Sequence, residues 1–256
     1  MARDPVQAAT ATFEIPSLAS ATWLRNPALV KVFGALVAGG YEARVVGGAV
    51  RNALLGQPVR DVDLAITATP EEAMRAVTSA GLAAIPTGIE HGTITVVSNH
   101  VPFEVTTLRR DVETFGRRAR VTYTTDWVDD ARRRDFTINA LYCAADGTIH
   151  DPLGGYRDLH ARRIRFIGSA VDRIREDYLR ILRFFRFTAE YGDGEPDAEG
   201  LAACIREQAG MDALSGERIR AEMLKLLIAP RAVPTTAAMA RAGVLARALG
   251  GTPDVG

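Results

Sequence analysis

Lysine, cysteine and long apolar runs are all scarce in this 256-residue sequence. The two cysteines, Cys143 and Cys204, lie far apart, which argues against a disulfide framework and fits a reducing compartment. Neither they nor the four histidines have the spacing of zinc ligands. No run approaches the roughly 20 apolar residues that span a bilayer, and the N-terminus lacks the pattern of a signal peptide. We therefore expect a cytoplasmic protein without membrane segments.

The positive charge is almost entirely arginine, because lysine occurs only at Lys31 and Lys225. The formal net charge is zero, so the overall balance does not indicate a nucleic-acid partner. The segment from Arg157 to Phe187, however, contains nine arginines and only four acids. Guanidinium groups bind phosphate oxygens in pairs, so this segment suits a phosphate ligand, although genome composition also explains a preference for arginine.

Hydrophobic periodicity predicts an α+β unit followed by an all-helical unit. The polar, aperiodic stretch Arg109–Thr125 is predicted to be a mobile loop, and a hairpin is expected around Ser98–His100. We expect a flexible lead-in over 1–22, a mixed-sheet domain over 23–148 and a helical domain over 149–256. The patterns predict helices at 27–38, 49–56, 70–80 and 129–136, strands at 42–46, 62–67, 92–98, 101–108 and 138–144, and mainly helices after Ala170.

The run GGAVRN, Gly47–Asn52, is the first candidate ligand site. Two glycines after a strand let the backbone approach a ligand, and Arg51 adds a fork of donors for an anion. A glycine pair before a helix is also a common structural turn. It is not the dinucleotide fingerprint G-x-G-x-x-G, which argues against a dehydrogenase.

Acidic residues of two predicted strands form the second candidate site. Asp61 and Asp63 are two residues apart at a strand start, so we expect both on one face, where a cation relieves their repulsion. Magnesium prefers such oxygen ligands and keeps positions open for phosphate. Glu104, an acid in an apolar strand, is the candidate third carboxylate. For an isolated pair of acids, a solvated strand end is the commoner structure.

Two arginine-rich segments are the third and fourth candidate ligand sites. In RRRDFTINAL, Arg134 and Asp135 precede an aromatic residue and suit a ribose or base. In EDYLRILRFFRF, Asp177, Arg180, Arg183 and Arg186 recur every third residue and share a helix face over consecutive turns. Surface ion pairs and a salt-bridged amphipathic helix are the alternative interpretations.

Together and in this order, these motifs resemble the class II tRNA nucleotidyltransferases, the CCA-adding enzymes, and their relatives the bacterial poly(A) polymerases. The resemblance covers roughly Val45 to Pro230 and includes DPLGGYRDL and SGERIRAEMLKLL. It implies a nucleotidyltransferase head domain, a small mixed sheet with flanking helices, followed by a helical neck and partial body. It also implies addition of CMP and AMP from CTP and ATP to the tRNA 3′ end, with release of pyrophosphate.

The resemblance also implies a role for each candidate residue. Asp61 and Asp63, with Glu104, would hold Mg²⁺ for two-metal transfer. Gly48 and Arg51 would contact the triphosphate, and Arg134 and Asp135 the ribose. Asp177 and Arg180 would read the base edge, and Arg183 and Arg186 would continue that site. The stretch Arg109–Thr125 would allow the change from C to A.

Two features depart from the family pattern. Asn52 stands where the family usually has aspartate, which puts a charge-dependent role there in doubt. The sequence ends at Gly256, where family members continue into body and tail segments that grip tRNA, so the tail is expected to be missing.

Poly(A), A-only or C-only addition is the alternative within the family, and a non-catalytic RNA-binding remnant is the alternative outside it. AAIPTGIEHGTITVV favours the CCA-adding type over the polymerases. The sequence does not predict an oligomeric state.

Overall fold

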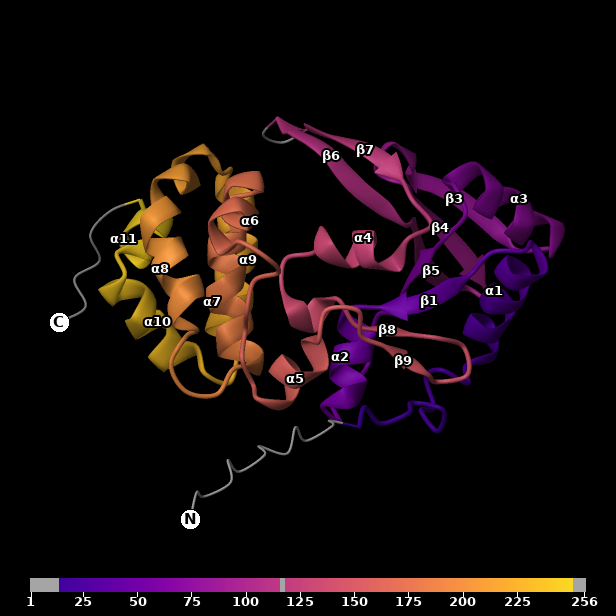
Figure 1. The fold of residues 1–256 in the computed structure, drawn as a ribbon, viewed down its shortest axis with the longest axis horizontal. Coiled ribbons are helices and arrows are strands. Elements are labelled where there is room, and N and C mark those ends of the chain that lie inside the picture. Colours follow the sequence, from indigo (N-terminus) through magenta and orange to yellow (C-terminus); the bar gives the residue numbers. More distant parts are fainter. Residues whose placement is uncertain (1–13, 116–117, 251–256) are drawn as a thin grey trace, which may run out of the picture.

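A seven-stranded mixed sheet lies beside a group of helices in the computed structural model, which describes residues 14–115 and 118–250 (Figure 1). The strands are β1 (Ala43–Val46), β2 (Asp63–Ile66), β3 (Ala83–Gly88), β4 (Thr93–Ser98), β5 (Val101–Thr107), β8 (Tyr142–Cys143) and β9 (Ile149–His150). Their order in the sheet is β3-β4-β5-β2-β1-β8-β9. β2 runs antiparallel to β1 and parallel to β5, so the sheet is mixed, as predicted.

The β4–β5 hairpin is confirmed, and it fixes a register that the site uses. Asn99 and His100 have φ angles of 50° and 64°, the left-handed values of a tight two-residue turn. The turn places Thr95 opposite Glu104. Because side chains alternate along a strand, Glu104 faces outward while its neighbours Phe103 and Val105 are buried.

Three helices flank this sheet: α1 (Pro27–Ala38), α2 (Gly48–Leu54) and α3 (Pro70–Ser79). α1 begins at Asn26, whose side chain accepts a hydrogen bond from the Ala28 amide, and it buries an apolar face against α3 and β4. α3 begins with a capping box in which Thr69 and Glu72 bond each other's backbone amides. These helix starts are those that the sequence predicted.

The prediction of a mobile loop over Arg109–Thr125 was wrong. β6 (Arg109–Phe115) and β7 (Arg118–Tyr123) pair as an antiparallel ribbon that extends away from the large sheet (Figure 1). Residues 116 and 117 lie outside the described residues. The ribbon sequence is dominated by charged and hydroxyl residues, so it has no apolar alternation to mark the strands, and backbone pairing alone defines them.

The strand predicted at 138–144 is largely replaced by a 3₁₀ turn, Thr137–Asn139, and only Tyr142–Cys143 pair as β8. Polar side chains explain the difference. Thr137 donates to the buried Asp158 carboxylate, and Asn139 donates to Asp135. These side-chain hydrogen bonds hold a turn in a segment whose composition favours a strand.

The rest of the chain is helical, as predicted. Helix α7 is central, since it packs against both α9 and α10. The helices are α4 (Trp127–Arg132), α5 (Gly155–His160), α6 (Ala170–Glu176), α7 (Leu179–Tyr191), α8 (Ala198–Glu207), α9 (Gly216–Leu227), α10 (Ala232–Arg241) and α11 (Val244–Ala248).

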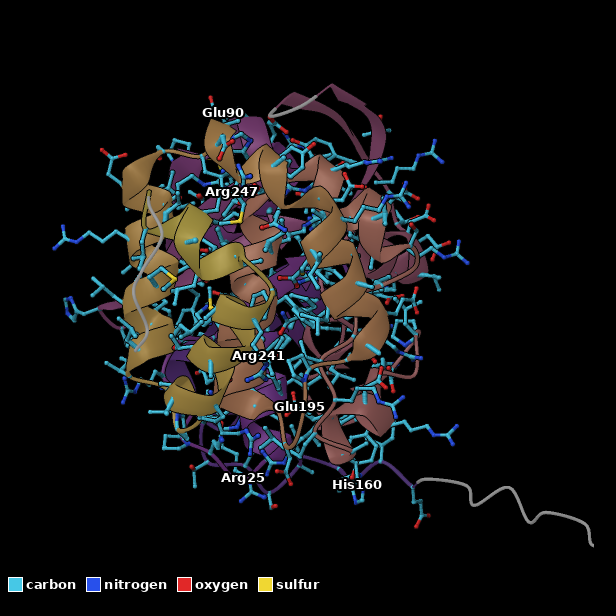
Figure 2. The ribbon with its side chains drawn as sticks, turned by 90° about the vertical axis from the view of Figure 1, so that its left-hand side faces the viewer. Arg25, Glu90, His160, Glu195, Arg241 and Arg247 are labelled. Atoms are coloured by element: carbon cyan, nitrogen blue, oxygen red, sulfur yellow. The ribbon has the colours of Figure 1, made fainter. Side chains whose placement is uncertain are left out.

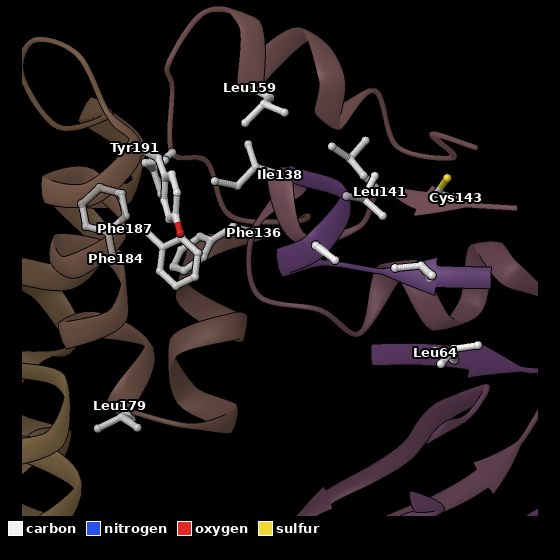
Figure 3. Packing of buried hydrophobic residues seen from close by; sticks show 14 of the residues in the cluster. Leu64, Phe136, Ile138, Leu141, Cys143, Leu159, Leu179, Phe184, Phe187 and Tyr191 are labelled. Carbon is white, nitrogen blue, oxygen red and sulfur yellow. The ribbon is translucent and has the colours of Figure 1, made fainter. Parts of the chain in front are cut away.

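An aromatic cluster joins the segment after α4 to α7 (Figure 3). Phe136 is fully buried, with its ring centroid 4.9 Å from that of Phe166 and 5.1 Å from that of Phe187. Phe184 stacks on Phe166 at 5.4 Å. One continuous buried cluster therefore runs from the sheet into the helices, and the domain boundary near residue 148 stays a prediction.

The outer surface of the helical part carries ion pairs, for example between Arg241 and Glu195 at 3.7 Å (Figure 2). Both side chains are well exposed, so water and salt screen the pair and it contributes little to stability. Within residues 14–115 and 118–250, no helix is long and apolar enough to cross a membrane.

Truncation of Phe136 tests the aromatic cluster. Phe136→Ala removes a fully buried ring, and we expect it to lower the free energy of unfolding by about 3–5 kcal/mol. Urea unfolding followed by circular dichroism measures the loss. Val37→Ala, at a position that is 60% exposed, is the control and should change it by less than about 0.5 kcal/mol. Equal effects of the two substitutions would contradict the packing.

Candidate active site

A cleft of about 590 Å³ lies between the sheet and α7. Ten of the eleven predicted site residues line it, and Asp61 does not. The lining residues are Val46, Gly47, Gly48, Arg51, Asp63, Leu64, Thr93, Glu104, Thr106, Arg109, Arg133, Arg134, Asp135, Asn139, Asp177, Arg180, Arg183, Arg186 and Phe187. Segments far apart in the sequence thus converge on one concave surface.

Two carboxylates lie side by side at the sheet edge of the cleft. Asp63 is the first residue of β2, and Glu104 precedes Val105, the residue of β5 that pairs with Leu64. The pKa of Asp63 is raised by partial burial and by the negative charges of Glu104 and Asp61, against the opposing effect of Arg134. Such mutual repulsion favours binding of a cation between the carboxylates.

Asp61 lies in the loop 57–62, two residues before Asp63, which is the first residue of β2. It does not line the cleft. It lines a second cavity of about 670 Å³ together with Asp63 and Glu104, so all three carboxylates border one space.

The side chains of Asp61, Asp63 and Glu104 suit a hard divalent cation, because all three offer carboxylate oxygens and their negative charges repel one another. Their geometry is more open than a formed metal centre. In the described part of the chain, no three acidic, histidine or cysteine side chains are gathered closely enough to hold a metal ion.

The glycine turn brings backbone and an arginine together beside the carboxylates, because it follows Val46, the residue of β1 that pairs with Asp63. Gly47 has φ 70° and ψ −115°, which only glycine adopts readily, and a Cβ there would lie 3.6 Å from the Asn139 carbonyl oxygen. A Cβ on Gly48 would lie 3.7 Å from a guanidinium nitrogen of Arg51. α2 is only seven residues long, so Arg51 carries more of the anion-binding argument than the helix dipole.

Arg51 is 94% buried and forms no ion pair within the described residues. It donates to the Asn139 side-chain oxygen and, at 2.7 Å, to the Tyr191 hydroxyl, and it lies over the Tyr191 ring. Burial lowers the pKa of its guanidinium, with nearby Tyr191 and Glu190 opposing the shift. A buried cation bonded to neutral groups is a strong candidate for pairing with an anionic ligand.

Asn52, the residue that departs from the family pattern, accepts from Arg51 through its side-chain oxygen at 3.2 Å and 3.1 Å. Its amide donates to the Pro58 carbonyl. Asparagine at this position therefore accepts the hydrogen bonds that orient Arg51. Because the asparagine side chain is neutral, it does not neutralise the charge of Arg51.

Arg134 and Asp135, predicted as one ligand-binding unit, have separate partners. Arg134 is held by the buried Asp130, at 2.8 Å, and by the Tyr142 hydroxyl, at 3.2 Å. Asp130 also pairs with Arg133 at 2.7 Å. The carboxylate of Asp130 thus orients two arginine side chains that line the cleft. The sequence analysis missed Asp130, because an acid beside arginines on a short helix looks like a surface pair.

Asp135 is bonded on both oxygens. It accepts from Asn139 at 2.9 Å and from Arg183 of α7 at 2.8 Å and 2.5 Å. These bonds hold the pKa of Asp135 below its usual range, although burial acts in the opposite direction as the largest single influence. Asn139 accepts from Arg51 and donates to Asp135, so it links the glycine turn to α7.

The four residues spaced by three at α7 all line the cleft, as predicted. Asp177 and Arg180 do not pair with each other. Asp177 precedes the helix and pairs with Arg218 at 2.7 Å, whereas Arg180 pairs with Glu176 at 2.5 Å. Arg186 is buried against Glu222 on α9 at 2.5 Å.

The cleft carries seven arginines, at positions 51, 109, 133, 134, 180, 183 and 186, and four acids, at positions 63, 104, 135 and 177. Positive charge therefore exceeds negative charge in the lining, which also includes the neighbouring carboxylates of Asp63 and Glu104. A ligand with several phosphates and a bound cation fits this set of charges.

Comparisons with known proteins agree with this geometry. The model of the poly(A) polymerase head domain matches residues 43–165, and that of the probable RNA- and SrmB-binding site of polymerase A matches residues 198–254. CCA tRNA nucleotidyltransferase 1, mitochondrial, of Danio rerio is 51% identical over 194 residues, 73% of this chain and 44% of the relative. The Bacillus stearothermophilus CCA-adding enzyme in complex with CTP matches with a TM-score of 0.76 and 36% identity, over 85% of this chain and 52% of that one.

A tRNA nucleotidyltransferase complexed with a primer tRNA and an incoming ATP analog matches with a TM-score of 0.69 and 26% identity, over 85% of this chain and 62% of that one. The fold is that of a nucleotidyltransferase head followed by a helical region. The chain belongs to the tRNA nucleotidyltransferase and poly(A) polymerase family. It spans about half the length of the curated relatives that it matches.

Asp130→Asn tests the anchor of Arg133 and Arg134. We expect a loss of about 3–5 kcal/mol at pH 7, because two arginines lose a buried anion. Ion pairing with both arginines lowers the pKa of Asp130 despite its burial, so its contribution is present above the unfolded carboxyl pKa of about 4 and fades as pH falls further.

Urea unfolding of Asp130→Asn at pH 7 and pH 3 measures this difference. Asp129→Asn, on the same helix and without a bonded partner in the described chain, is the matched control. A destabilisation by Asp130→Asn that is equally large at both pH values would contradict the ion-pair explanation.

Proposed function

We propose that this chain is a metal-dependent tRNA nucleotidyltransferase that adds CMP and AMP from CTP and ATP to the tRNA 3′ end and releases pyrophosphate. The observation that carries the proposal is the set of charges that meet in one cleft. Arg51, which is buried and forms no ion pair with a described residue, lines the same cleft as the arginines of α7 and the carboxylates of Asp63 and Glu104. The relatives and structures that match the chain support the same activity.

Asp61 and Asp63 would hold Mg²⁺, with Glu104 as the third catalytic carboxylate. Nucleotidyltransferases of this family generally use divalent metal ions. When bound, such ions activate the attacking hydroxyl and neutralise charge on the triphosphate and the leaving pyrophosphate. The raised pKa of Asp63 supports this placement, because a carboxyl repelled by its neighbours gains most from a cation.

Gly48 and Arg51 would bind the triphosphate, since the glycine permits close approach and the buried guanidinium has no anionic partner among the described residues. Arg134, oriented by Asp130 and Tyr142, would hold the ribose. Asp135 would act on the ribose together with Arg183, because the two are already bonded to each other.

Asp177 and Arg180 would read the base edge, and Arg183 and Arg186 would complete that side of the nucleotide site. In the structure these residues bond to Arg218, Glu176, Asp135 and Glu222. A bound base must therefore exchange with the existing partners of Asp177 and Arg180. This exchange makes base recognition dependent on a small movement at the start of α7.

Poly(A), A-only or C-only addition uses the same cleft and is the second candidate activity, since one matching family model is that of a poly(A) polymerase head. The cytoplasmic location stays a prediction, because the Danio rerio relative is named as mitochondrial.

Incorporation of labelled nucleotide tests the activity. With Mg²⁺ and tRNAs that end before C74, C75 or A76, we expect additions of C, C and A that stop at the complete CCA end. Long A-tails would support a polymerase instead, and no incorporation with any acceptor would overturn the enzymatic proposal. Asp63→Ala should abolish incorporation while circular dichroism and the unfolding midpoint are retained. Substantial activity in that variant would remove the metal assignment.

Base discrimination tests the reading role. Arg180→Ala and Asp177→Asn should relax the choice among CTP, ATP, UTP and GTP by about tenfold, because a lost base-edge hydrogen bond costs roughly 1–2 kcal/mol. Ratios of kcat/KM for the four nucleotides measure the effect. Arg175→Ala, which breaks an exposed pair with Glu207, is the control. Unchanged ratios in the Arg180 and Asp177 variants would refute the assignment.

A further inference from the structure

The last residue of α7 is a tyrosine that does not line the cleft but bonds to an arginine that does. Tyr191 is 4% exposed, and its ring centroid lies 5.5 Å from that of Phe187 (Figure 3). Its hydroxyl accepts a hydrogen bond from Arg51 at 2.7 Å, and the Arg51 guanidinium lies 4.0 Å from the centre of its ring. Tyr191 is therefore placed to act on a ligand of the cleft through Arg51, without touching the ligand itself.

The Tyr191 hydroxyl also donates a hydrogen bond to a carboxylate. One oxygen of Glu190 accepts from Tyr191 at 2.7 Å, and the other accepts from Arg186 at 3.2 Å. The phenolic oxygen thus lies between a cation, Arg51, and an anion, Glu190, and bonds to both. Burial raises the pKa of Tyr191 to about 12, with nearby Arg51 opposing the shift, so at neutral pH the hydroxyl keeps the proton that it donates.

Every hydrogen-bond acceptor of Arg51 within the described residues is neutral. Besides the tyrosine hydroxyl they are the side-chain oxygens of Asn52 and Asn139. Neutral acceptors orient a guanidinium and leave its charge for an anionic ligand, whereas a carboxylate in direct contact would compete with that ligand. The charge of Glu190 acts on Arg51, and the Tyr191 hydroxyl keeps the two groups from direct contact.

We propose that Tyr191 is a positioning residue for the nucleoside triphosphate, because it holds Arg51 at the cleft and keeps it from pairing with Glu190. This role rests on the proposed function, in which Arg51 binds the triphosphate. It adds a residue that none of the candidate motifs contains, since the arginine-rich motif of α7 ends at Phe187.

The ring and the hydroxyl of Tyr191 can be tested separately. The ring packs against Phe187 in the buried cluster, and Tyr191→Phe retains it. The substitution removes only the oxygen that lies between Arg51 and Glu190. The Glu190 side chain is 38% exposed, so it has room to rotate toward the guanidinium and form a direct ion pair. That pair would withdraw the charge of Arg51 from a bound triphosphate.

Calorimetric titration with CTP and Mg²⁺, without any acceptor RNA, tests the role. Tyr191→Phe should raise the Kd for CTP about tenfold, as for loss of a charge-assisted phosphate contact. The Kd for CMP, which lacks two of the three phosphates, should stay unchanged. Tyr156→Phe is the matched control, because Tyr156 lies outside the cleft lining and its hydroxyl bonds to no described residue. An unchanged Kd for CTP in Tyr191→Phe, or an equal loss of CTP and CMP binding, would overturn the role.

Glu190→Gln separates this role from a structural one, because it removes the charge of Glu190 and retains the shape. Alone it should leave the Kd for CTP unchanged, since Arg51 still has neutral acceptors. Combined with Tyr191→Phe it should restore the wild-type Kd, because no carboxylate is left to pair with Arg51. Structural damage from Tyr191→Phe would not be repaired by a second substitution that loses another hydrogen bond. A double variant that binds CTP as weakly as Tyr191→Phe would therefore refute the role.

Steady-state kinetics connect the binding result to the reaction. In Tyr191→Phe the KM values for CTP and ATP should rise about tenfold, and the KM for the tRNA acceptor should not change. If the chain incorporates no nucleotide but CTP binding responds as described, the proposed function fails and the role of Tyr191 stands. If it incorporates nucleotide while Tyr191→Phe changes neither the Kd nor the KM for CTP, the role is refuted and the proposed function stands.

Discussion

The buried guanidinium of Arg51 connects the two walls of the cleft, and the arrangement of the site depends on this connection. It is buried, forms no ion pair with a described residue, and bonds to Asn139 on one side and to Tyr191 of α7 on the other. Because these partners come from two other segments, the guanidinium sets the distance between the glycine turn and α7. In the proposed function different elements bind the triphosphate and the base of one nucleotide, and Arg51 would hold these elements in position relative to each other.

The remaining arginines of the cleft are largely neutralised within the protein. Asp130 orients Arg133 and Arg134, Asp135 holds Arg183, and Glu222 holds Arg186. Buried pairs of this kind add little net stability compared with an apolar core, but they fix side-chain geometry before a ligand arrives. The proposed base reading by Asp177 and Arg180 differs, since it would require both to leave their present partners. In this proposal the phosphate end of the site is more rigid than the base end.

Local signals in the sequence predicted much of the fold. The Asn26 and Thr69 caps set the starts of α1 and α3, and the positive-φ turn at Asn99–His100 defines the β4–β5 hairpin. The ribbon β6–β7 was missed because its pairing involves backbone groups, and charged side chains give no hydrophobic period. Tyr191 was missed for another reason. Its role depends on a hydrogen bond from Arg51, which is 140 positions away in the sequence, and no local pattern contains such a contact.

The sequence by itself determined the family, the helices that begin at Pro27 and Pro70, the β4–β5 hairpin and ten of the residues that line the cleft, because each depends on residue type and spacing along the chain. Only the tertiary structure decided which acid meets which arginine. It paired Asp177 with Arg218 and Asp135 with Arg183. Ion pairs and cavities arise from distances in space, and these are set when the sheet and α7 pack around Phe136.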